Sequence, residues 1–151
     1  MSFLNAVINN VEDASLREEL QDRVDIILHK IKFMDKVAVS CLGVNNLPNA
    51  LLDVLIDAAG GEVKANAAEA RVVIYHQTQY SMPDLMAEVP VLLDYTWPAV
   101  EFNRLYVMDD ASAYLSDPES FVASLEDMAE MLYPGYFVFG NEGRTWAGFT
   151  V

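Results

Sequence analysis

The feature that most constrains the fold is a succession of strand and helix patterns in residues 36–105. Four stretches are apolar and rich in β-branched residues, as strands buried in a sheet are, namely residues 36–42, 62–65, 70–75 and 89–95. Helical patterns separate most of these stretches, which favours parallel pairing of the strands. The sequence therefore predicts an α/β fold with a small, four-stranded, mostly parallel sheet flanked by helices.

The helices of this region have recognisable ends. Residues 47–59 form an apolar helical pattern that ends at Gly60 and Gly61, because glycine accepts the left-handed backbone found after helices. Ser81 is placed to cap a second helix, and Thr96 a third. Trp97 opens that third helix, where we expect it to anchor the core.

Residues 1–35 predict a helical extension of the core, which we take as residues 36–110. Ser15 and Glu18 have the spacing of a capping box at the start of a long helix. Apolar residues then recur at steps of three and four in a narrow seam. This seam either packs on the chain's own core or pairs with a second subunit in a homodimer. Its residues are Leu20, Val24, Ile27, Ile31 and Met34.

Residues 111–151 predict a further helix and a β-hairpin, both packed on the core within one compact domain. The helix begins at Asp117 and runs to about residue 132, with its apolar residues in one stripe. Strands at 136–139 and 144–151 flank a turn rich in glycine and asparagine. The aromatic residues of the hairpin either fill the core or form a surface for a partner.

The chain is strongly acidic, with a formal net charge of −14. Of its 23 acidic and 9 basic residues, 12 acidic and 2 basic residues follow position 79. Such a charge repels phosphate backbones, so direct nucleic-acid binding is disfavoured. The acidity either keeps the protein soluble or presents a negative face to a basic partner protein.

The composition also bears on location. No apolar run approaches the roughly 20 residues that a bilayer crossing needs. The first five residues lack the order of a secretory signal, and the single cysteine, Cys41, cannot form a disulfide within the chain. These features predict a cytoplasmic protein that does not enter a membrane.

Several motifs resemble those of the BRCT domain, a module of DNA-repair proteins. They are the stretches 58–63, 71–75 and 89–97, with the small pair Gly60 and Gly61 and with Trp97 early in the last helix. The resemblance covers residues 36–105. It implies a four-stranded parallel sheet with helices on both faces, and binding rather than catalysis.

Members of that family that bind phosphopeptides use a serine or threonine near the end of the first strand and a lysine in the second helix. Ser40 matches the first position, but the second helix, at residues 81–88, contains no lysine and two acidic residues. Without the cation the phosphate would lose its strongest contact. We therefore expect no phosphopeptide binding.

Candidates for catalysis are few. His76 follows the strand at 70–75, at the edge where open α/β sheets often bind ligands, and it is the best catalytic candidate by position. Neither His76 nor His29 has a cysteine or a second histidine at the spacing of a zinc site. Residues 43–48 lack the glycines and lysine of a phosphate loop. We expect no cofactor and no bound metal.

Three functions are consistent with these observations. The first is a non-enzymatic protein-interaction module with a BRCT-like core. The second is an acidic inhibitor of phage or mobile-element type, which mimics nucleic acid and blocks the basic groove of an enzyme. The third is a small α/β enzyme that uses residues near His76. The candidate partner-binding residues are Ser40, Asn45, Asp109, Asp110, Glu126, Asp127 and Glu130.

Overall fold

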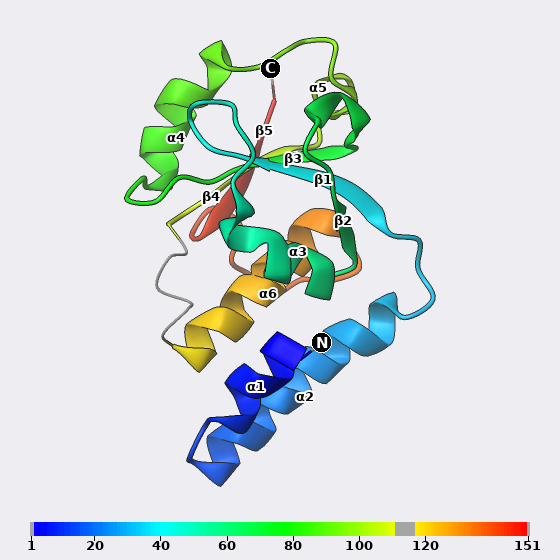
Figure 1. Cartoon of the computed structure of the whole chain (residues 1–151), viewed down its shortest axis with the longest axis vertical. Helices are drawn as coiled ribbons and strands as arrows, with labels where there is room; N and C mark the ends of the chain where they lie inside the picture. The colour runs from blue at the N-terminus through cyan, green and yellow to red at the C-terminus, as the bar shows by residue number, and fades with distance from the viewer. Residues whose placement is uncertain (1, 111–116, 151) are drawn as a thin grey trace.

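The computed structural model describes residues 2–110 and 117–150, with side chains from residue 6 onward, and contains a central five-stranded sheet (Figure 1). The strands lie in the order β2-β1-β3-β4-β5. The first four pair in parallel, and β5 pairs antiparallel with β4. The α/β fold is thus confirmed, but the sheet is mixed and has five strands rather than four. The strands are β1 (Val37–Leu42), β2 (Gly61–Val63), β3 (Val72–Tyr75), β4 (Leu105–Met108) and β5 (Trp146–Phe149).

Helices cover both faces of the sheet. The α-helices are α1 (Ser2–Asn9), α2 (Ala14–Ile31), α3 (Asp53–Ala58), α4 (Met82–Glu88), α5 (Pro98–Glu101) and α6 (Pro118–Leu132). Short 3-10 helices are η1 (Ala50–Leu52), η2 (Ala67–Glu69) and η3 (Val89–Val91). Within residues 2–110 and 117–150, no helix has the length and apolar character of a membrane span.

Alternating side chains along each strand divide the core in two, because successive residues of a strand point to opposite faces. On β3, Val72 and Ile74 join one cluster, while Val73 and Tyr75 join the other. The first cluster includes residues of α1, α2, α3 and α6, and the second includes residues of α4 and α5. The sheet therefore has α3 and α6 on one face and α4 and α5 on the other (Figure 1).

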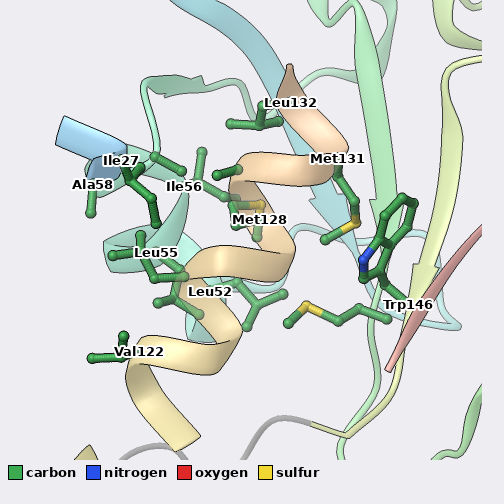
Figure 2. Packing of buried hydrophobic residues seen from close by; sticks show 14 of the residues in the cluster. Ile27, Leu52, Leu55, Ile56, Ala58, Val122, Met128, Met131, Leu132 and Trp146 are labelled. Atoms are coloured by element: carbon green, nitrogen blue, oxygen red, sulfur yellow. The ribbon is translucent and has the colours of Figure 1, made fainter. Parts of the chain in front are cut away.

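The helices α1 and α2 form a further layer on the side of α6 that faces away from the sheet (Figure 1). Figure 2 shows Val122 and Met128 of α6 close to Leu55 of α3, with Ile27 of α2 nearby. The helix α6 is therefore packed on two sides, and every residue from Leu125 to Leu132 is buried.

The apolar seam of α2 packs within the chain. Leu20, Val24 and Ile27 are fully buried, and Ile31 and Met34 pack against the same cluster. Of the two alternatives for this seam, the structure shows packing within the chain, because α6 and its neighbours already cover the residues through which a homodimer would form. The start of the helix also differs from the prediction, since Asp13, not Ser15, caps it by accepting from the amides of Ser15 and Leu16.

The prediction of a strand at residues 89–95 is also wrong. Its first three residues form η3, and the fourth parallel strand is instead β4, which follows the helix that Trp97 opens. Pro90 explains the difference, because proline lacks the amide that a central strand must donate. Trp97, and not Thr96, occupies the N-cap position of the short helix α5, and its side chain makes no capping hydrogen bond. Trp97 is 9% exposed, which confirms it as a core residue.

The C-terminal helix is confirmed, since α6 begins after Asp117 and ends at Leu132. The hairpin is not. Only β5 forms a strand of the sheet, while Phe137 and Phe139 stack on each other and pack on the first core cluster. The predicted partner strand at 136–139 therefore contributes packing instead of pairing.

Candidate functional site at the carboxyl edge of the sheet

The strand order places a switch point between β1 and β3. From β1 the chain moves outward to β2, then returns to the other side of β1 to form β3. In open α/β sheets, ligands bind outside the carboxyl ends of the strands at such a point. Residues 43–49 follow β1 and residues 76–81 follow β3, so both loops leave the sheet there.

The loop after β1 is held in place by two asparagines. Asn46 has a left-handed backbone with φ of 62°, a conformation that asparagine tolerates better than most residues. Its side chain accepts from the Tyr75 hydroxyl at 2.7 Å and donates to the Leu92 carbonyl at 2.7 Å. Asn49 accepts from the Leu51 amide at the start of η1 and donates to the His76 carbonyl at 3.0 Å.

His76 lies at the centre of this edge and is fully buried. Its Nδ1 is 3.5 Å from Nδ2 of Asn49, and its Nε2 is 3.8 Å from Oδ1 of Asp110. Burial lowers the pKa of His76, and the carboxylates of Asp110 and Asp109 partly oppose that effect. The imidazole is therefore predominantly neutral at pH 7.

The two aspartates after β4 hold the second loop. Oδ1 of Asp109 accepts from the Met82 amide at 3.0 Å, and Oδ2 of Asp110 accepts from the Gln79 amide at 2.8 Å. Gln79 needs this support because its φ is 70°. The predicted partner-binding role of the two aspartates stays a prediction, but both already order the loop beside His76.

We call the six residues Asn46, Asn49, Tyr75, His76, Asp109 and Asp110 the edge network. Amide, hydroxyl, imidazole and carboxylate groups are all present in it, so it contains both donors and acceptors of hydrogen bonds. The sequence of residues 43–49, 76–81 and 109–110 contains no lysine or arginine. Among the residues that the structure describes, no group of three or more His, Cys, Asp or Glu could hold a metal ion.

The other predicted site residues lie elsewhere or have structural partners. Ser40 is buried within β1 and donates to the Lys64 carbonyl at 2.6 Å. Asn45 is exposed next to the edge network, where it accepts from the Leu47 amide at 3.1 Å. The catalytic role of His76 and the absence of phosphopeptide binding both stay predictions.

Three of the four acidic residues of α6, namely Glu126, Asp127 and Glu130, are buried and not exposed to a partner. Glu126 pairs with Arg23 of α2, with Oε1 at 2.5 Å from Nη2. Asp127 accepts from Asn141 and Thr145, at 3.1 and 2.6 Å. Together with Glu130 these residues are at most 7% exposed. They bind other parts of the chain, so they cannot form an outward acidic strip.

The sequence alone did not identify Asn46, Asn49 and Tyr75 as site residues. A short loop with three asparagines between a strand and a helix was the available signal. The loop lacks the glycines and the lysine of a phosphate loop, and of its three asparagines the sequence indicates only Asn45, as a candidate partner-binding residue. Polar residues that directly follow parallel strands would have been the better criterion.

No family model and no curated protein matches this chain. Two solved structures are similar to it. An ABC transporter substrate-binding protein from Listeria monocytogenes EGD-e has a TM-score of 0.65 and 18% identity, over 80% of this chain and 56% of its own. The TroA-like periplasmic binding protein FepB from Veillonella parvula has a TM-score of 0.60 and 16% identity, over 82% and 47%. The chain thus spans about half the length of these proteins.

These similarities correct the resemblance to a BRCT domain. Gly60, Gly61 and Trp97 are present at the expected positions, but they serve helix ends that other α/β folds also contain. The sheet instead matches proteins named for substrate binding, which contradicts both the BRCT interaction module and the acidic inhibitor. The prediction of a cytoplasmic location is wrong on the same grounds, since one of the two proteins is periplasmic.

Proposed function

We propose that this chain is a solute-binding domain that holds a small polar molecule at the carboxyl edge of its parallel strands. The observation that carries the proposal is the edge network, which gathers polar side chains from three strand ends at the switch point of the sheet. The similarity to two binding proteins of the same fold supports it.

The charge of this edge indicates the class of solute. Asp109 and Asp110 contribute negative charge, and the adjoining loops contain no basic residue. An anion would be repelled and would find no charged donor. The expected solute is therefore a neutral polar molecule or a cation.

The same similarity supports a partner and a location. A domain related to transporter substrate-binding proteins is expected to work outside the cytoplasm and to deliver its solute to a membrane transporter, which would be its protein partner. Cross-linking in cells of the native host, followed by mass spectrometry, tests this part of the proposal. Recovery of cytoplasmic proteins alone would contradict it.

A panel of solutes tests the binding itself. Thermal unfolding is measured with neutral sugars, zwitterionic amino acids, polyamines and divalent cations, and with phosphate and citrate as the anions. A ligand that binds only the folded state raises the unfolding temperature in proportion to its occupancy. We expect a rise with a member of the first four groups and none with the anions. No rise with any solute would refute the proposal.

Two matched substitutions then locate the site. Asn49→Asp keeps the oxygen that caps η1, but it replaces the donor to His76 with a negative charge. Asn66→Asp makes the same change at the cap of η2, outside the edge network. We expect the first to change solute affinity at least about tenfold, which is about 1.4 kcal/mol, and the second to have little effect. Equal effects would exclude the edge network.

A further inference from the structure

A hollow with a volume of about 270 Å³ lies at the amino edge of the sheet, opposite the edge network, and we call it the arginine pocket. It is lined by Arg71, Pro98, Phe102 and Arg104. Arg71 directly precedes β3 and Arg104 directly precedes β4, and these two strands pair in parallel. Parallel strands begin at the same edge of a sheet, so the pairing brings both arginines together.

The charge of this pocket is opposite to that of the chain around it. The net charge of the protein is −14, and residues 65–151 contain only three lysine or arginine residues, which are Arg71, Arg104 and Arg144. Two of these three line one hollow. Within the described residues, neither of the two forms an ion pair with a carboxylate. The pocket is therefore a local positive site that can attract an anion.

Arg104 is held in place by the fold itself. Its Nε donates to the Tyr106 hydroxyl at 3.1 Å, and its guanidinium carbon lies 5.9 Å from the centre of the Tyr106 ring. Its Nη2 donates to the carbonyls of Met131 and Leu132, at 3.0 and 3.2 Å. These contacts leave the two N–H groups of Nη1 without a hydrogen-bond partner among the described residues. A guanidinium that is already ordered loses little freedom when an anion binds to it.

Arg71 has a fixed main chain and an unengaged side chain. Its amide donates to the Ala38 carbonyl at 2.9 Å, beside β1. Its side chain is exposed, and no hydrogen bond or ion pair joins it to another described residue. All five N–H groups of this guanidinium are therefore left for water or for a ligand.

An apolar wall completes the pocket. Phe102 is 67% exposed although its side chain is large and apolar. The turn after α5 holds it there, because the Phe102 amide donates to the Pro98 carbonyl at 2.9 Å. The Arg104 amide donates to the Ala99 carbonyl at 2.8 Å, which closes the same turn. Pro98 and Phe102 thus offer apolar surface beside two guanidinium groups.

We propose that the arginine pocket binds a small monocarboxylate whose carboxylate is attached to an apolar body. The carboxylate accepts from Nη1 of Arg104 and from the guanidinium of Arg71, while the apolar body lies against Phe102 and Pro98. Phosphate and citrate carry more negative charge and have no apolar part, so the acidic protein repels them more strongly and the apolar wall does not bind them. This site is separate from the edge network and takes a second ligand.

Three probes test this assignment in the full chain: benzoate, acetate and benzyl alcohol. Each is titrated to high millimolar concentration at constant ionic strength, because small ligands bind weakly and added salt screens charges. Binding is followed by ¹H–¹⁵N NMR at the Phe102 amide and at Nε of Arg104, with the Asn46 amide as a signal of the edge network. We expect benzoate to shift the first two signals at a concentration at least about threefold lower than acetate, which lacks the apolar body. Benzyl alcohol, which lacks the charge, should cause no shift at Arg104, and the Asn46 signal should stay unchanged.

Two matched substitutions locate the site. Arg71→Gln and Arg144→Gln each remove one positive charge from an exposed side chain, but only the first changes the pocket. We expect Arg71→Gln to weaken benzoate binding at least about threefold, because one of two charge-assisted contacts is lost. Arg144→Gln should change it by less than about 1.5-fold, since distant charges are screened.

A third substitution tests the apolar wall. Phe102→Ala should reduce the affinity for benzoate to that for acetate, because the exposed ring no longer contacts the apolar body. Arg71 and Phe102 are both exposed, so their variants are expected to fold. Equal affinities of the wild type for benzoate and acetate would overturn the proposal. Equal effects of the two arginine substitutions, or phosphate binding more tightly than benzoate, would overturn it as well.

Discussion

Protonation of Asp127 is predicted to stabilise the fold. This side chain is 3% exposed, and burial raises its pKa from 3.8 to about 6, although hydrogen bonds from Thr145 and Asn141 oppose the change. The carboxylates of Glu130 and Glu126 contribute to the same rise in pKa. A pKa difference of about two units between the folded and the unfolded state corresponds to roughly 3 kcal/mol of stability, at 1.36 kcal/mol per unit.

The direction of the effect follows from the higher pKa of the folded state. The folded protein binds this proton more tightly than the unfolded chain does, so the stabilisation is complete below about pH 4. It is lost as the pH rises through about 6. Other carboxylates titrate in the same range, so the wild type must be compared with Asp127→Asn, in which this position carries no charge.

The assay is urea unfolding followed by circular dichroism, at four values between about pH 4 and pH 7. Between these limits we expect the wild type to lose roughly 3 kcal/mol more of its unfolding free energy than Asp127→Asn does. Asp57→Asn, at an exposed position of α3, is the control and should follow the wild type. Identical pH dependence in the wild type and Asp127→Asn would refute the reasoning.

The same unfolding assay at neutral pH checks three further changes. Gly61→Ala places a methyl group 2.5 Å from Cγ2 of Ile56, so we expect a loss of about 1–3 kcal/mol; a neutral result would mean that the backbone moves freely there. Tyr133→Phe removes a hydroxyl whose single proton is shared between two main-chain carbonyls, at 2.9 and 3.1 Å, and should cost about 1–3 kcal/mol. Ile27→Ala should cost about 2–5 kcal/mol, because the side chain is fully buried against α6. The adjacent Ile26 is 52% exposed, so Ile26→Ala should cost less than about 0.5 kcal/mol, and equal losses would contradict the packing of α2.

The parts of the fold that sequence reasoning predicted have strong local signals. Ser81 forms a capping box with Asp84, and Asp117 caps α6, as the side-chain chemistry of helix starts requires. The strands β1 and β3 are apolar and β-branched on both faces, which is the pattern of central parallel strands. Gly60, whose φ is 91°, follows the end of the helix α3, as the sequence predicted.

The parts that it missed depend on tertiary contacts. The run at 89–95 is as apolar as a strand, but its place in the sheet is taken by β4, only four residues long. The edge network joins residues 27 to 34 positions apart, such as Asn49 with His76 and His76 with Asp110. No local pattern indicates such pairs, because they arise only when the strand order is known. The similarity to solved structures, and not a local pattern, decided against the BRCT resemblance.

The position of α6 between two layers links both ends of the chain. On one side Glu126 binds Arg23 of α2, and on another Asp127 binds the segment that leads into β5. Removing residues 1–35 would therefore uncover Val122 and Leu125, and removing the last residues would free Asp127. Shortened versions of the protein, from either end, are thus expected to aggregate instead of yielding a smaller functional unit.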